Sequence, residues 1–181
     1  MGMNRLVDRM IRAAKLDPQL YEEVEADPSS LNQAVIVVVI SSVAAGVGSL
    51  IADGGVGLFG GTMLALIGWL LWSGVVYLIG VKLLPEPQTQ ADYGQLLRTI
   101  GFSSSPGVLR IFGFIPVIGW GLNFLVGVWM LAAMVVAVRQ ALDYEGTGRA
   151  FVVCLLGWLA YLIVFGLLSI MLAAGGLLVS G

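Results

Sequence analysis

A positively charged side chain lies inside an apolar stretch of this sequence. Arg110 falls within residues 93–115, a segment long enough to cross a membrane. A cation in hydrocarbon costs about 2.5–3.5 kcal/mol or more, and such a residue marks a functional site by default. Arg110 could hold a lipid phosphate, an anionic solute or a buried carboxylate. The alternative is that its long side chain snorkels to the headgroups, because Ile115 at the end of the segment is near.

Polar residues and a proline precede this arginine in the same segment. They are Ser103, Ser104, Ser105 and Pro106. Proline removes a backbone donor, and serine hydroxyls can bond the carbonyls that are freed, so a broken helix packed inside a helical bundle is expected. Broken helices at membrane depth are tolerated against protein or a water-filled cavity, where transporters bind their substrates. The other interpretation is a plain proline kink packed on neighbouring helices.

The rest of the composition argues against catalysis and against metal binding. The chain has no histidine and one cysteine, Cys154. The patterns of serine hydrolases, P-loop nucleotide-binding proteins and zinc proteases are absent. We expect no catalytic residue, no cofactor and no metal. The net charge of −2 gives no field that would attract nucleic acid.

The elements that must position these residues are membrane-spanning helices. Of the 181 residues, 59% are hydrophobic and 11% are charged, whereas soluble domains carry about 25% charged residues. An all-α, polytopic membrane protein is therefore predicted. Five apolar segments are expected as spans: residues 31–52, 56–84, 93–115, 117–138 and 150–178.

The predicted spans divide the chain into a cytoplasmic segment, residues 1–30, and a five-helix transmembrane domain, residues 31–181. With the N-terminus inside, eight of the nine Lys and Arg residues fall on the inner side, as the positive-inside rule favours. The rival topology makes residues 93–115 a re-entrant hairpin and leaves four spans. It would place Arg139 and Arg149 outside, so five spans are preferred.

The cytoplasmic segment is expected to begin with an amphipathic helix over residues 3–16. Its cations, Arg5, Arg9, Arg12 and Lys15, lie largely on one face and are predicted to contact anionic headgroups at the membrane surface. Asp17-Pro18 and Asp27-Pro28 are each predicted to start a further helix, because Asp is a good N-cap and Pro suits the first helical position.

This layout resembles the Yip family of membrane proteins, especially its small bacterial branch. The resemblance is carried by residues 17–27 (DPQLYEEVEAD), by residues 96–106 (LLRTIGFSSSP), by Gly107 to Arg110 and by residues 133–142 (AMVVAVRQAL). Residues 101–106 are similar to the Gly-Tyr-Ser…Pro stretch of the family's third span, with Phe102 in place of the usual Tyr. The resemblance implies five spans after a short N-terminal segment.

Eukaryotic members of that family are associated with Rab GTPases and with membrane shape and traffic between the ER and the Golgi. That role uses a long cytosolic N-terminal domain with an Asp-Leu-Tyr-Gly-Pro motif, which does not occur in these 181 residues. GTPase binding is therefore not carried over to this chain.

The functional expectation is a non-catalytic, membrane-organising or partner-binding protein of the bacterial cytoplasmic (inner) membrane, with its N-terminus in the cytoplasm. Its partners would be the lipid bilayer, including anionic lipids, and a second copy or another membrane protein. The alternative is a small transporter or channel subunit with its site at the broken third helix. A polar cavity reaching Arg110 would favour the alternative, and a fully packed bundle would favour the first function.

Overall fold

The computed structural model describes residues 3–49, 57–115 and 118–179, with side chains as far as Ile163. Every regular element in these ranges is a helix, as the composition predicts. The elements are α1 (Met3–Ala14), α2 (Pro18–Ala26), α3 (Ser30–Gly48), α5 (Gly57–Tyr77), the π-helix η1 (Leu78–Leu83), α6 (Tyr93–Ser103), the 3-10 helix η2 (Ser105–Phe114), α7 (Ile118–Ala141) and α8 (Thr147–Val179).

Three of the described helices are long and apolar enough to cross a membrane. They are Ser30–Gly48, Leu58–Leu83 and Ile118–Ala141, and the described part of α8, Thr147–Ile163, is apolar but shorter. The three long helices match three of the predicted spans to within a few residues, and the bounds of α8 match those of the predicted fifth segment. The ends predicted between residues 50 and 56, and at residue 117, lie outside the described residues.

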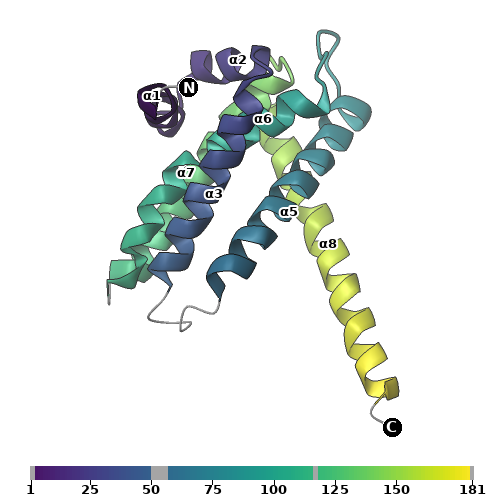
Figure 1. Cartoon of the computed structure of the whole chain (residues 1–181). Coiled ribbons are helices and arrows are strands. Elements are labelled where there is room, and N and C mark those ends of the chain that lie inside the picture. Colours follow the sequence, from purple (N-terminus) through teal and green to yellow (C-terminus); the bar gives the residue numbers. More distant parts are fainter. Residues whose placement is uncertain (1–2, 50–56, 116–117, 180–181) are drawn as a thin grey trace.

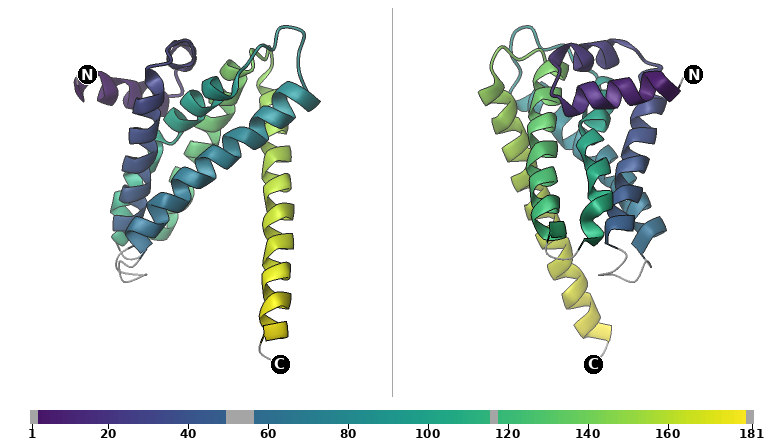
Figure 2. Two further views of the ribbon diagram at one scale, coloured as in Figure 1. Left: turned by 45° about the vertical axis from the view of Figure 1, so that its right-hand side comes forward. Right: turned by 90° about the vertical axis from the view of Figure 1, so that its left-hand side faces the viewer.

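The predicted third span is a broken segment rather than one helix. It consists of α6 followed by η2, and η2 lies between α3 and α7 and packs against both. In Figure 2 this segment runs down between the two longer helices. α5 packs on α3 and α6, and α8 packs on α7, α5 and η1 (Figure 1).

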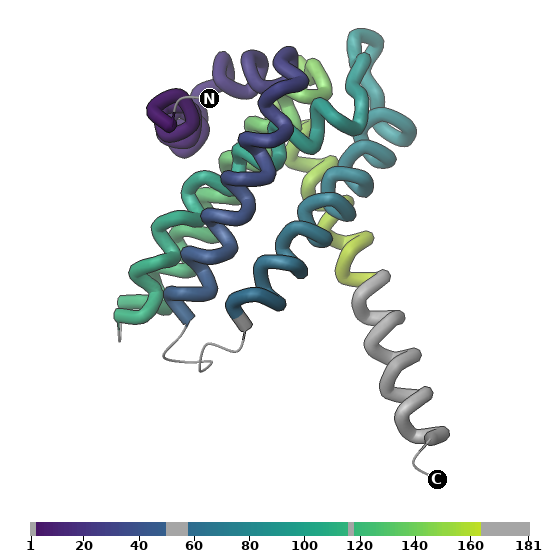
Figure 3. The backbone as a smooth tube through the Cα atoms, in the orientation of Figure 1, coloured from purple at the N-terminus to yellow at the C-terminus, as the bar shows by residue number. Residues whose placement is uncertain are grey.

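The two N-terminal helices lie at the end of the bundle where α3 begins, as Figure 3 shows in purple. α2 packs on α6 and α7. Fully buried apolar side chains from α2, α6 and α7 belong to one core cluster, which includes Leu20, Tyr21, Val24, Leu96, Phe102 and Val138 together with Leu142 beyond α7. The core therefore continues across the predicted boundary at residue 30, and α2 belongs to the same packed unit as the membrane helices.

Local sequence explains how α2 begins, but not how α3 begins. Asp17 is the N-cap of α2, with Pro18 at the first helical position, and its carboxylate accepts a bond from the backbone N–H of Gln19. The prediction for Asp27-Pro28 is wrong in detail, because α3 starts two residues later, at Ser30. Asp27 is instead the C-cap of α2. Its carboxylate accepts hydrogen bonds from the hydroxyls of Ser29 and Ser30, which stabilises a turn between the helices.

Candidate functional site

The third apolar segment is interrupted at Ser104. α6 ends at Ser103, and η2 begins at Ser105 with Pro106 in its first turn. Because Pro106 has no backbone N–H, the α-helical ladder cannot continue through it. The hydroxyls of Ser103 and Ser105 each donate to the carbonyl three residues earlier, at 2.7 and 2.6 Å. Two of the three serine hydroxyls therefore donate to backbone carbonyls of α6.

The carbonyl at the break is satisfied by protein and not by lipid. The Ser104 oxygen accepts bonds from the hydroxyl of Ser41 on α3, at 2.7 Å, and from the backbone N–H of Gly107, at 2.9 Å. Pro106 and Gly107 are buried beside it. The break therefore packs inside the bundle, where its polar backbone groups have partners.

Arg110 lies one 3-10 turn beyond Gly107 on η2. Its Nε is buried and has no hydrogen-bond partner. Among the described residues, no carboxylate pairs with its guanidinium. Arginine carries five N–H donors and no acceptor, so an unpaired buried donor here is a cost that a bound anion would remove.

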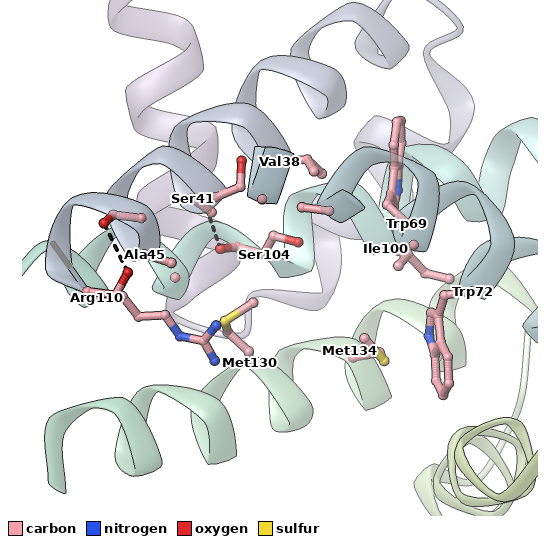
Figure 4. A pocket seen from close by; sticks show the side chains of 17 residues that line it. Val38, Ser41, Ala45, Trp69, Trp72, Ile100, Ser104, Arg110, Met130 and Met134 are labelled. Atoms are coloured by element: carbon pink, nitrogen blue, oxygen red, sulfur yellow. Dashed lines mark hydrogen bonds between the residues drawn. The ribbon is translucent and has the colours of Figure 1, made fainter. Parts of the chain in front are cut away.

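The guanidinium faces a cavity of about 610 Å³ between α3, α5, η2 and α7. Figure 4 shows Arg110 and Met130 at one end of this cavity and Trp69 and Trp72 at the other. The lining is mostly apolar, with four serines among the polar residues. The lining residues are Val38, Ser41, Ser42, Ala45, Gly46, Ser49, Gly61, Ala65, Gly68, Trp69, Trp72, Ile100, Ser104, Gly107, Arg110, Met130 and Met134.

A second orphan donor lines the same cavity. The indole Nε1 of Trp72 is buried without a partner, whereas that of Trp69 donates to the carbonyl of Leu97 at 3.1 Å. Sequence reasoning missed Trp72. The sequence does contain a signal for it. Gly61, Ala65 and Gly68 are small residues spaced four and three apart on α5, and Trp72 follows four residues later on the same helix face.

Close backbone contact fixes the position of η2 on α3. A Cβ on Gly48 would clash with the carbonyl oxygen of Arg110, and Gly113 packs against the same glycine. The backbone of Arg110 therefore touches the end of α3 directly, which only glycine allows at this position. The small residues of α3 thus do two things, since Gly48 gives close approach while Ser42 and Gly46 leave the cavity open.

Of the four predicted membrane-surface cations, Arg9 is buried inside the protein, so the prediction for this residue is wrong. Its side chain is only 1% exposed and forms an ion pair with Glu23 at 2.6 Å. It also donates to Ser30 at 2.9 Å and to Gln33 at 3.0 Å. The physical reason is that α2 packs beside α1, so the acidic residues of α2 and of its C-cap form ion pairs with Arg9 and Arg12.

The other three cations differ in their exposure and in the ion pairs that they form. Arg12 pairs with Asp17 and with Glu23, both at 2.8 Å, whereas Arg5 is exposed and 3.6 Å from Glu23. Lys15 is exposed. The guanidinium of Arg9, and then that of Arg12, holds the pKa of Glu23 below its ordinary value.

The structure therefore brings only part of the predicted site together. Ser104 and Arg110 line one cavity, Ser103 and Ser105 donate to carbonyls of α6, and Pro106 is buried outside the lining. The hydroxyls of Ser41, Ser42 and Ser49 already donate to backbone carbonyls. Within the described part of the chain, the buried unpartnered donors of the lining are the Nε of Arg110 and the indole N–H of Trp72, so the cavity suits an anionic group with an apolar body. Among the described residues no group of three His, Cys, Asp or Glu side chains could hold a metal ion.

Long apolar helices and a broken helix buried between two others define a multi-pass membrane protein. Compared with known protein families, residues 16–169 match the Yip1 domain. The chain belongs to the Yip1 domain family, and the match includes α2 as well as the membrane helices. Comparison with curated proteins and with solved structures gives no match.

Proposed function

We propose that this Yip1-domain protein is a non-catalytic membrane protein that binds an anionic phospholipid in the cavity at Arg110 and so organises the lipid around it. The observation that carries the proposal is the buried, unpartnered Nε of Arg110 in a cavity of about 610 Å³. A phosphate is a strong acceptor for a guanidinium, and the apolar walls suit an acyl chain.

The lining argues for binding rather than chemistry. Its serines have no histidine, carboxylate or lysine beside them in the cavity, and a serine nucleophile needs such a base within hydrogen-bond reach. The second candidate is a small transporter or channel subunit, which the cavity beside a broken helix favours. The mostly apolar lining supports an amphiphile over a small hydrophilic solute.

The proposal includes five membrane crossings with the N-terminus in the cytoplasm. This topology is supported by the course of the segment formed by α6 and η2, which runs from one end of the bundle to the other. α6 packs on α2 at the end where α3 begins, and the backbone of Arg110 and Gly113 contacts Gly48 at the end where α3 stops. A re-entrant hairpin would return to its starting side. Reporters fused after Gln88, Glu145 and Gly181 should report inside, inside and outside. An inside signal at Gly181 would contradict this topology.

The lipid test compares Arg110→Leu with Lys82→Gln, which removes one charge from an exposed position outside the cavity. Native mass spectrometry in detergent, with phosphatidylglycerol or phosphatidylcholine added, measures binding. We expect Arg110→Leu to weaken phosphatidylglycerol binding about tenfold or more, because a hydrogen bond to a charged group contributes about 1.5–3 kcal/mol. Arg110→Lys should restore part of it, and Lys82→Gln should have little effect.

Two neighbouring glycines give a test of the cavity itself. Gly60 and Gly61 both lie on α5 with open space where a Cβ would be, but only Gly61 lines the cavity. Gly61→Leu should therefore weaken lipid binding, and Gly60→Leu should not. Equal effects of the two changes would mean that the lipid binds elsewhere.

Three further outcomes decide between the candidates. Unchanged lipid content together with raised thermal stability in Arg110→Leu would reject the site and leave the break as architecture. Displacement of the lipid by inorganic phosphate, or binding of phosphate alone, would favour the transporter.

A further inference from the structure

Helix α1 presents three different faces. Its bundle side carries the buried residues Leu6, Arg9 and Ala13. A second face is apolar and exposed, with Met3 at 75%, Val7 at 47% and Ile11 at 50% exposure, each four residues from the next. The third face is exposed and polar and consists of Asn4, Arg5 and Asp8, and the exposed Lys15 follows directly after the helix.

The charges of this region do not favour attraction to an anionic surface. The segment 3–27 holds six acidic residues and four basic ones. Arg9 and Arg12 are paired with Glu23, Asp27 and Asp17. Electrostatic attraction to anionic lipid scales with the basic residues that remain unpaired, and few remain here.

Contacts with the bundle place α1 at the edge of the lipid-facing surface. α1 packs on η2, α6 and α7, and it lies across the bundle in the right-hand view of Figure 2. The indole of Trp129 on α7 donates to the carbonyl of Ala14 at 2.7 Å, which satisfies a carbonyl at the end of α1. Trp129 is half-exposed, and tryptophan is enriched at membrane interfaces.

Two of the elements that α1 contacts also expose large apolar side chains. These are Leu109 and Phe112 on η2, and Leu125 and Val128 on α7. In a multi-pass membrane protein such side chains meet acyl chains. The exposed stripe of α1 belongs to a helix that packs directly on these two lipid-facing elements.

We propose that Met3, Val7 and Ile11 insert into the acyl boundary of the adjoining leaflet and hold α1 in the plane of the membrane. The insertion is driven by apolar contact, while Arg9 and Arg12 fasten the helix to α2. The occupant of this face is therefore lipid, and anionic headgroups are not required. This contact is independent of the Arg110 cavity.

Adjacent positions on α1 provide a matched test. In a Cys154→Ala background, Val7→Cys and Asp8→Cys carry a nitroxide label on the full chain in vesicles. Collision rates with oxygen, which partitions into hydrocarbon, and with a nickel chelate, which stays in water, measure the surroundings of each label. The ratio of oxygen to nickel collisions should be several-fold higher at position 7 than at position 8.

The lipid composition separates the two driving forces. The difference between positions 7 and 8 should be the same in phosphatidylcholine vesicles and in vesicles that also contain phosphatidylglycerol. Equal ratios at the two positions would overturn the proposal. A difference that appears only with phosphatidylglycerol would assign the contact to the cations, and shielding of position 7 from both reagents would assign it to another protein surface.

Discussion

Arg9 is buried and Arg110 is partly buried, and the donors of the two side chains meet different surroundings. Arg9 lies where three helices meet and donates to Glu23, Ser30, Gln33 and Asp27. Arg110 lies beside a cavity, and its buried Nε has no partner among the described residues. Burial alone therefore does not distinguish a structural arginine from a binding one, whereas the number of donors left unpaired does.

The difference follows from what each helix packs against. α1 meets acidic residues of α2, which lie outside the membrane helices and can stay charged in contact with water. η2 packs on α3 and α7, and Arg110 faces small and apolar residues of α3, α5 and α7 across the cavity. The first arginine should therefore contribute to the free energy of unfolding, and the second should reduce it unless a ligand is bound.

The largest expected effect is that of Arg9→Leu. This change leaves Glu23 without its closest cation and Gln33 without its donor, so the free energy of unfolding should fall by about 2–4 kcal/mol. Thermal unfolding in detergent measures it. Arg5→Leu is the control, because Arg5 is exposed and weakly paired, and it should change stability by less than about 0.5 kcal/mol. Equal losses in the two variants would contradict the assignment.

A second change tests the contact that fixes Arg110. Gly48→Ala places a Cβ against the backbone carbonyl of Arg110, which cannot move without shifting η2, so we expect a loss of about 1–3 kcal/mol and weaker lipid binding. Gly60→Ala, where the Cβ meets open space, should be neutral or slightly stabilising. A Gly48→Ala protein with unchanged stability would show that η2 adjusts freely.

The docking of α2 should depend on pH through Glu25. Its carboxylate accepts a bond from Gln95, and burial, together with the nearby Asp143, raises its pKa to about 7. The folded state therefore holds the proton more tightly than the unfolded state, and stability should fall by about 1–3 kcal/mol as pH rises from about 4.5 to 7.

Glu25→Gln should remove this pH dependence, because an amide does not titrate. The amide oxygen also keeps an acceptor for Gln95. Unfolding midpoints measured between pH 5 and 8 test it. Glu23 and Asp27 act in the opposite direction, since their pKa values are lowered and their stabilisation is lost only in more acid solution. A slope that persists in Glu25→Gln would point to another group.

The smallest effect on stability is expected for Arg110→Leu in detergent without lipid. Removing an unpaired buried donor should leave the unfolding midpoint unchanged or raise it. Added phosphatidylglycerol should then raise the midpoint of the unaltered protein but not that of the variant. If Arg110→Leu lowered stability as much as Arg9→Leu, the two arginines would have the same structural role.

Local sequence predicted those features that depend on neighbouring residues. Pro106 lacks the N–H that an α-helix continued from α6 would need, and Asp17-Pro18 caps α2 as expected. The burial of Arg9 could not be predicted from its own helix, because it depends on how α2 folds back. The charges of residues 3–15 and 17–27 do complement each other, and that was the available signal.

The cavity was harder to predict than the break that borders it. Small residues at helical spacing are compatible with close helix packing and with an open space between helices. Gly48 and Gly61 illustrate the two outcomes, since one touches a backbone and the other faces a cavity. Which outcome applies depends on the neighbouring helix, and therefore on tertiary structure.

The 3-10 geometry of η2 gives its side chains a register of three. Residues three apart eclipse one another in such a helix, so Gly107, Arg110 and Gly113 form one column, with a glycine on either side of the arginine. Deleting one residue between Pro106 and Arg110 would turn the guanidinium by a third of a revolution, away from this column. Deleting three would keep its direction and move it about 6 Å along the axis. The number of residues between Pro106 and Arg110 therefore sets both the direction in which the guanidinium points and its position along the helix axis.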